Sequence, residues 1–236
     1  MITEPYTSLE DVVQDPVFPD VDLALRRGRH IDLDDPEWFA FLAETQHWLE
    51  TFYRRFGCEL IRVTDGYFYL LPSGDRLGRR QLTRGEMLVG QGLALMYLDP
   101  ATLKASGVVP LAQLLELLAS LVGQDRLVAT LNARRSRPRD ARIAEETARK
   151  EVAKALRGLE RLGFVERLPD DLLRLRAPLM RFADPVRGLT DPARALAQLV
   201  ERGEVTLEDD GGDDDGDGDE TNGSDERDGQ DAEDAP

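Results

Sequence analysis

Four cationic side chains in the stretch 144–162 have the spacing of a single helix face. Lys150, Lys154, Arg157 and Arg161 recur at i, i+4, i+7 and i+11, which places them on one side of a helix. Cations gathered on one face can neutralise phosphate groups, so the pattern indicates contact with the backbone of a nucleic acid. The alternative is an ordinary amphipathic helix whose outer face is solvated.

Further arginines just upstream favour the nucleic-acid interpretation, because only Asp140 opposes their charge. We therefore include them as candidate DNA-binding residues: Arg134, Arg135, Arg137, Arg139 and Arg142.

The residues around this stretch predict the element that positions the cations. The opposite face is apolar and is predicted to enter a core: Ala148, Val152, Ala155, Leu156, Leu159 and Leu162. Gly163 is placed to end the helix, and the strings FVERL and LLRLR then predict a hairpin around 169–171. A helix followed by a hairpin ends a winged-helix domain, with the helix in the recognition position.

The preceding part of the chain repeats this order of elements. We predict a helix over 17–27, a short strand at 30–33 and a helix over 36–56; Asp-Gly at 65–66 predicts a hairpin between CELIRV and YFYLLP. The second half begins with helices over 84–98 and 111–121, separated by a short strand at 108–110.

The predicted fold is mainly α, of the α+β class, with tandem winged-helix domains that carry small β-hairpin wings and are followed by a disordered acidic tail. The predicted boundaries are a loose N-terminal arm (1–14), winged-helix domain 1 (15–72), a linker (73–84), winged-helix domain 2 (85–183), a C-terminal connector and helix (184–204) and the acidic tail (205–236).

The predicted helix over 36–56 carries an unusually wide arc of aromatic side chains. Such an arc is most often simple core, but its width also suggests burial against a second copy of the chain. The candidate dimer-interface residues are Trp38, Phe41, Trp48 and Phe52.

Charge is distributed unevenly along the 236 residues. The chain has 46 acidic and 30 basic residues, and 208–236 contains 15 of the acidic residues with only Arg227 as a cation. Residues 1–207 therefore hold 31 acidic and 29 basic residues, so this part is near neutral and can carry local basic patches. The tail is too polar and too charged to form a core.

No residue pattern predicts catalysis, a cofactor or a metal. The GQG string at 90–92 lies inside an apolar helical pattern and lacks the Lys-Ser/Thr ending of a phosphate-binding loop. Neither the single cysteine, Cys58, nor the two histidines, His30 and His47, have the spacing of a zinc site. We expect no catalytic, cofactor-binding or metal-binding residues, and a cytoplasmic protein without a signal peptide or membrane span.

Several longer strings resemble the MukE family, the winged-helix accessory subunits of MukB-type bacterial condensins. They are DPVFP, LALRRGRHIDLDD, FLAETQHWLETFYRRFGCELIR and DGYFYLLP within 15–72, then MLVGQGLALMYLDPATL, LERLGFVERL and LMRFADPVRG within 87–188. The arm, the arginine-rich 134–142 segment, Glu160 and the length of the tail depart from the family pattern.

The resemblance implies a homodimer that binds the kleisin MukF, acts with the SMC-like ATPase MukB and contacts duplex DNA without sequence preference, in association with the nucleoid. Two rival hypotheses remain: a stand-alone winged-helix transcription regulator, and a pure scaffold that makes no DNA contact.

Overall fold

The computed structural model describes residues 6–73, 76–77, 80–123, 131 and 141–183. All described residues belong to one compact unit, Met1–Val205. Within that unit the described residues form two lobes, each with its own hydrophobic core and its own antiparallel sheet. We call 6–73 the first lobe and 83–183 the second.

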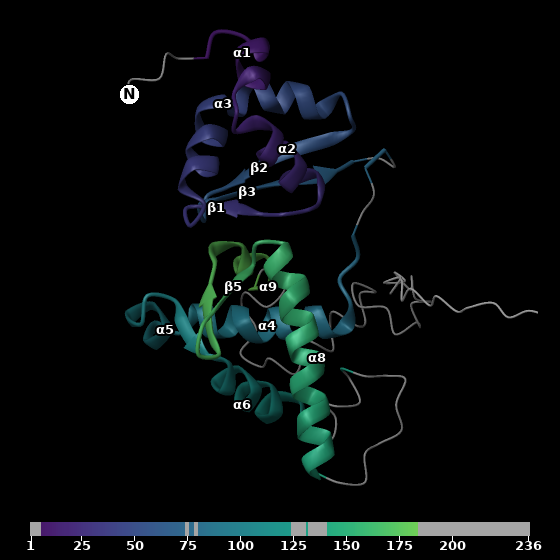
Figure 1. Cartoon of the computed structure of the whole chain (residues 1–236), viewed down its shortest axis with the longest axis vertical. Helices are drawn as coiled ribbons and strands as arrows, with labels where there is room; N and C mark the ends of the chain where they lie inside the picture. Colours follow the sequence, from purple (N-terminus) through teal and green to yellow (C-terminus); the bar gives the residue numbers. More distant parts are fainter. Residues whose placement is uncertain (1–5, 74–75, 78–79, 124–130, 132–140, 184–236) are drawn as a thin grey trace, which may run out of the picture. The chain divides into compact units, whose positions relative to one another are not determined.

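The first lobe contains three helices and three strands (Figure 1). They are α1 (Leu9–Gln14), α2 (Phe18–Arg26), β1 (Ile31–Asp32), α3 (Pro36–Arg54), β2 (Cys58–Val63) and β3 (Tyr67–Pro72). β3 lies between β1 and β2. The predicted hairpin is confirmed, with Val63 opposite Tyr67 beside a left-handed Gly66.

The second lobe repeats the same sheet topology. Its elements are α4 (Arg84–Leu98), α5 (Pro100–Lys104), β4 (Val108–Pro110), α6 (Leu111–Val122), α8 (Ala141–Arg161), β5 (Val165–Leu168), β6 (Leu172–Leu175), a 3-10 turn η1 (Ala177–Leu179) and α9 (Met180–Ala183). β6 lies between β4 and β5, just as β3 lies between β1 and β2. Both lobes therefore run from helix to strand to helix to hairpin, which confirms the predicted α+β class.

The expectation of a loose arm is wrong for 9–14. Ser8 and Asp11 form a capping box, in which each side chain binds the backbone N–H of the other residue. Val12 from the resulting helix is fully buried in the first core. The cap is readable in the sequence, but a six-residue helix is stable only through such packing.

Residues 177–183, at the end of the predicted winged-helix domain 2, carry two further elements that the sequence patterns did not predict. These residues form η1 and α9 and pack against α4. Leu179, Phe182 and Ala183 enter the second core. The predicted final helix at 191–203 and the acidic tail lie outside the described residues.

The two glycines of the GQG string, Gly90 and Gly92, lie where other helices pack closely against α4. A Cβ on Gly90 would overlap the ring of Phe182, and a Cβ on Gly92 would overlap Leu118. Both residues lie within a regular helix, so their role in the described structure is to let α9 and α6 approach α4 closely.

Candidate nucleic-acid interface

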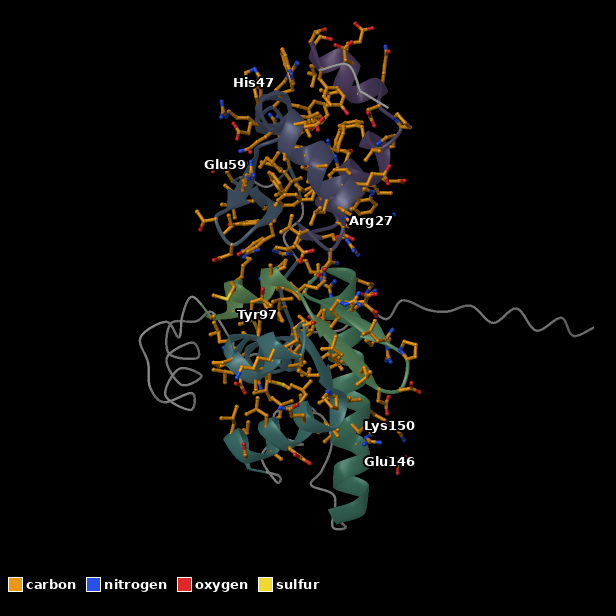
Figure 2. The ribbon with its side chains drawn as sticks, turned by 90° about the vertical axis from the view of Figure 1, so that its left-hand side faces the viewer. Arg27, His47, Glu59, Tyr97, Glu146 and Lys150 are labelled. Atoms are coloured by element: carbon orange, nitrogen blue, oxygen red, sulfur yellow. The ribbon has the colours of Figure 1, made fainter. Side chains whose placement is uncertain are left out.

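The predicted two faces of α8 are confirmed. The six apolar residues of one face are all buried in the second core. Lys150, Lys154, Arg157 and Arg161 are all exposed on the other. We call these four residues the α8 stripe. Figure 2 shows Lys150 beside Glu146 on α8, and the two side chains form an exposed ion pair with 2.9 Å between Nζ and Oε1.

Lys150 is the only stripe cation with a carboxylate partner within the described residues. The hydrogen bond from Lys150, and then its positive charge, lower the pKa of Glu146. Ion pairs with this degree of exposure contribute little to stability, so Lys150 remains able to exchange its partner for a phosphate. Lys154, Arg157 and Arg161 have no carboxylate partner among the residues that the structure describes.

Glu160 lies within the basic part of the helix but does not neutralise the stripe. Its carboxylate accepts hydrogen bonds from Nε of Arg167 at 2.7 Å and from the backbone N–H of the same residue at 3.1 Å. The departure from the family pattern at Glu160 thus ties α8 to β5. A second pair, Glu166 with Arg174, crosses the hairpin at 2.8 Å.

The structure does not describe the side chains of the other residues that the sequence predicts to bind DNA. Arg134, Arg135, Arg137 and Arg139 lie outside the described residues. Arg142 belongs to the first turn of α8, but its side chain is also outside them. Their assignment to DNA stays a prediction.

The position of α8 depends on a close approach to the N-terminal end of α4 (Figure 1). A Cβ on Gly158 would overlap Oε1 of Glu86. Glu86 is buried and cannot easily move, because it accepts hydrogen bonds from the N–H of Thr83 at 2.9 Å and from Arg80 at 2.6 Å. Gly158 is therefore needed where α8 crosses the N-terminal end of α4, because a side chain there would collide with Glu86.

Replacing Gly158 with alanine should lower the free energy of unfolding by about 1–3 kcal/mol, because the added methyl group must displace Glu86. Helix propensity alone predicts the opposite, a gain of about 1 kcal/mol. Gly85→Ala is the matched control, since a Cβ there makes only ordinary contacts, the nearest with Cδ2 of Leu131 at 3.6 Å. Urea unfolding measures both variants. Equal stability of Gly158→Ala and the unmodified protein would contradict the crowding.

The candidate dimer residues do not share one environment. Phe41 is 5% exposed and belongs to the core of its own lobe, where its ring meets the ring of Tyr6 edge-on at 5.9 Å. Tyr6, from the segment expected to be a loose arm, packs against Phe41 and leaves it little surface for a partner, so its assignment to an interface stays a prediction. Trp38, Trp48 and Phe52 are partly buried and pack against the core.

A buried polar contact joins the two lobes, and the sequence patterns did not predict it. Asp32 of β1 forms an ion pair with Arg176, and Arg176 also binds Asp35 at 2.6 Å. The side chains of Asp32 and Arg176 are 3% and 5% exposed. Burial raises the pKa of Asp32, although hydrogen bonds from Arg176 oppose that shift. The two residues are 144 positions apart, so no local motif reports their pairing.

His30 forms the second part of this contact. Its Nδ1 lies 3.0 Å from the carbonyl oxygen of Leu162, and its backbone N–H donates to the same oxygen at 2.8 Å. Arg181 Nη1 lies 2.7 Å from His30 Nε2 and donates to it, so the geometry fits a neutral ring with its proton on Nδ1. A Cβ at Gly163 would overlap the carbonyl oxygen of His30. His30 is thus buried at the contact between the lobes.

Burial, and then the positive charge of Arg181, lower the pKa of His30 to about 3 from an ordinary 6.5. Because the protonated ring is disfavoured in the folded protein, stability is retained above pH 6.5 and is lost as the pH falls toward 3. We expect the loss between pH 7 and pH 5 to be about 2 kcal/mol from this group.

The test of that loss compares urea unfolding at pH 7 and pH 5. His30→Asn cannot titrate, so its pH-dependent loss should be smaller than that of the unmodified protein by about 2 kcal/mol. His47→Asn, on the exposed surface of α3, is the control and should leave the pH dependence unchanged. The same pH dependence in His30→Asn and the unmodified protein would refute the assignment.

A cavity of about 560 Å³ lies beside this contact. Four arginines line it, Arg26, Arg27, Arg80 and Arg181, together with apolar side chains that include Leu71, Leu77 and Phe164. Nε2 of Gln91, another lining residue, is buried without a hydrogen-bond partner in the described structure. The cavity therefore combines cationic, apolar and hydrogen-bonding groups.

The described residues contain no group of three or more His, Cys, Asp or Glu side chains placed to hold a metal ion. Cys58 is buried, and burial raises the pKa of its thiol, as is typical of a packing residue. No helix in the described part of the chain is long and apolar enough to cross a membrane.

Fold and site together define a two-lobed α+β protein with duplicated topology and an exposed cationic helix in the second lobe. The model of the MukE-like family matches residues 6–234. The chain is 38% identical over 160 residues to a chromosome partition protein MukE from Pasteurella multocida, covering 67% of this chain and 65% of that protein. It is 36% identical over 169 residues to the protein of that name from Escherichia coli O157:H7, covering 71% and 74%.

The chain belongs to the MukE-like family. The match to the Pasteurella protein, like the match to its relative from Mannheimia succiniciproducens, covers 65% of the relative's length.

Proposed function

We propose that this chain is a non-enzymatic subunit of a bacterial SMC-like condensin of the MukBEF type, acting in chromosome condensation and partition. The observation that carries the proposal is membership of the MukE-like family across residues 6–234. Its partners are then a second copy of the chain, the kleisin MukF, the ATPase MukB and duplex DNA, and its place in the cell is the nucleoid.

The duplicated topology supports two winged-helix domains. In each lobe the long helix before the hairpin, α3 or α8, has the position of a recognition helix. The two helices differ in charge: α8 exposes the cationic stripe, whereas α3 exposes Glu37 and Glu44, with Arg54 as an exposed cation at its C-terminal end. This difference favours DNA contact by the second lobe and protein contact by the first.

The cavity at the lobe contact supports capture of an extended segment of the kleisin. An extended peptide presents backbone carbonyl groups that can accept from Gln91, apolar side chains that fit against Leu71 and Leu77, and carboxylates that pair with the arginines. A segment held there would touch both lobes.

Partly buried aromatic residues support a homodimer through the first lobe. Trp38, Trp48 and Phe52 remain partly accessible, and Phe56 at the end of the same segment is 39% exposed. Aromatic anchors of this kind are enriched in interface cores. Light scattering should give the mass of a dimer at micromolar concentration.

Binding to unrelated duplexes separates this proposal from a stand-alone transcription regulator. A condensin subunit should hold the phosphate backbone of several unrelated 30-bp duplexes with affinities within about threefold of each other. A regulator should prefer one sequence by roughly a thousandfold or more. A strong preference for one duplex would overturn the condensin assignment, and no binding to any duplex would favour the pure scaffold.

A further inference from the structure

The first lobe contacts the C-terminal end of α8, and Arg27 lines the same cavity as Leu162. The contact is made by Gly28 and His30: a Cβ on Gly28 would lie 3.4 Å from Cδ2 of Leu162, and the N–H of His30 binds the carbonyl oxygen of Leu162. Arg161 immediately precedes Leu162, and Arg27 immediately precedes Gly28. Each arginine is thus the chain neighbour of a residue in this contact, one from each lobe.

The carboxylates around this contact are bound to other arginines. Their pairs are Asp22 with Arg26 at 2.8 Å, Asp35 with Arg29 at 3.1 Å and Arg176 at 2.6 Å, Glu86 with Arg80 at 2.6 Å, Glu160 with Arg167 at 2.7 Å, and Asp32 with Arg176. Arg27 and Arg161 are exposed, and neither has a carboxylate partner among the residues with described side chains. Two exposed guanidinium groups beside one contact leave a local excess of positive charge.

We propose that Arg27 extends the DNA-binding surface from α8 onto the first lobe. This inference rests on the proposed DNA contact of the α8 stripe. From Lys150 to Arg161 the stripe rises about 16 Å, which is roughly half a turn of duplex DNA. Arg27 lies beyond the C-terminal end of that stripe, where the phosphate backbone of a duplex lying along α8 continues.

DNA contacts on both lobes would have a structural consequence. The backbone contacts of a duplex fix the orientation of the protein on DNA, and contacts from two bodies fix it better than contacts from one helix. The buried ion pair of Asp32 with Arg176 joins the two lobes, so that both can contact one duplex at the same time. Arg27 is thus a positioning contact that carries no sequence information.

The experiment measures binding of the full chain to a fluorescent 30-bp duplex by anisotropy, over a range of salt concentrations. Arg27→Gln should weaken binding about three- to tenfold at low salt and reduce the log–log salt slope by about 0.9. Arg27→Lys should restore most of the affinity. Lys104→Gln removes one exposed charge on α5 and should leave binding unchanged.

Circular dichroism checks that each variant is folded, and three outcomes overturn the inference. An unchanged affinity and slope in Arg27→Gln, with binding lost in a variant of the α8 stripe, would show that DNA contacts only the second lobe. Loss of capture of the acidic kleisin segment with unchanged DNA binding would assign Arg27 to that peptide. Absence of DNA binding in the unmodified protein would refute the proposed DNA contact itself, and this inference with it.

Discussion

Replacing Arg176 with alanine should lower the free energy of unfolding by about 3–5 kcal/mol, because the change leaves the carboxylate of Asp32 buried without its partner. Asp32 is 2% exposed, and Asp34 and Asp35 lie within 3.8 Å and 2.6 Å of the same guanidinium group. Removing that group thus leaves several negative charges close together. No exposed ion pair of this protein should have an effect of that size.

Two spectroscopic probes can follow this loss in the separate lobes. Both tryptophans, Trp38 and Trp48, belong to the first lobe, whereas circular dichroism reports helices of both lobes. If Arg176 couples the lobes, the two urea transitions should coincide in the unmodified protein and separate in Arg176→Ala.

The control for Arg176 is a comparable arginine on the surface. Arg174 pairs with Glu166, and both side chains are more than 40% exposed, so Arg174→Ala should cost less than about 1 kcal/mol. The double variant Asp32→Asn with Arg176→Met should recover part of the stability, since it removes both charges together. A loss below 1 kcal/mol in Arg176→Ala would contradict the account of the contact.

Reversing the charge of Lys154, Arg157 and Arg161 to glutamate should weaken binding to duplex DNA about a hundredfold or more at low salt. Each lost contact is expected to contribute about 1 kcal/mol, the upper end for exposed pairs. The plot of the logarithm of the binding constant against the logarithm of the salt concentration should become less steep. Its slope is expected to be roughly −3.6 for four stripe contacts, and its magnitude should decrease by about 2.7. The weakening should be the same for every duplex sequence, because phosphate contacts carry no base information.

A change of net charge alone could mimic this result, so the control must match it. Arg54, Arg55 and Lys104 are exposed cations outside α8. Their triple replacement by glutamate gives the same change in net charge and should weaken binding only slightly. Equal losses in the two triple variants would mean that DNA responds to overall charge, and that the α8 stripe is an ordinary solvated face.

The sequence was sufficient to predict the elements whose signals are local. The two faces of α8 follow from its 3.6-residue periodicity, and the structure buries the apolar face and exposes the cations. The hairpin at 58–72 follows from Asp-Gly between alternating strands. These features depend on neighbours within a few residues.

The contact between the lobes could not be predicted in the same way. Asp32 reads as part of a short strand, Asp35 as a residue at a helix start, and Arg176 as the end of a strand, because nothing local reports a pair formed across 144 residues. Gly158 likewise resembles a weak position in a helix until Glu86 is placed against it. The burial of Phe41 within its own lobe is equally hidden from local patterns, since it involves contact with a residue 35 positions away.

Capture of the kleisin is the most direct test of whether this chain is a condensin subunit, and the cavity supplies a matched pair of variants for it. Leu71 lines the cavity and is 41% exposed; Leu98 is 46% exposed at the end of α4 and is not among the lining residues. Leu71→Glu places a carboxylate where an apolar side chain of the kleisin should pack, so it should weaken capture. Leu98→Glu should have no effect.

The measurement is gel filtration after coexpression of the full chain with the MukF-type kleisin of the same organism. We expect one complex that contains both proteins and survives low and high salt, because the apolar part of the contact is not screened. Leu71→Glu should shift the kleisin to a separate peak, while Leu98→Glu should elute as the unmodified complex does. Separate elution of the two unmodified proteins at both salt concentrations would contradict the assignment of this chain to a condensin.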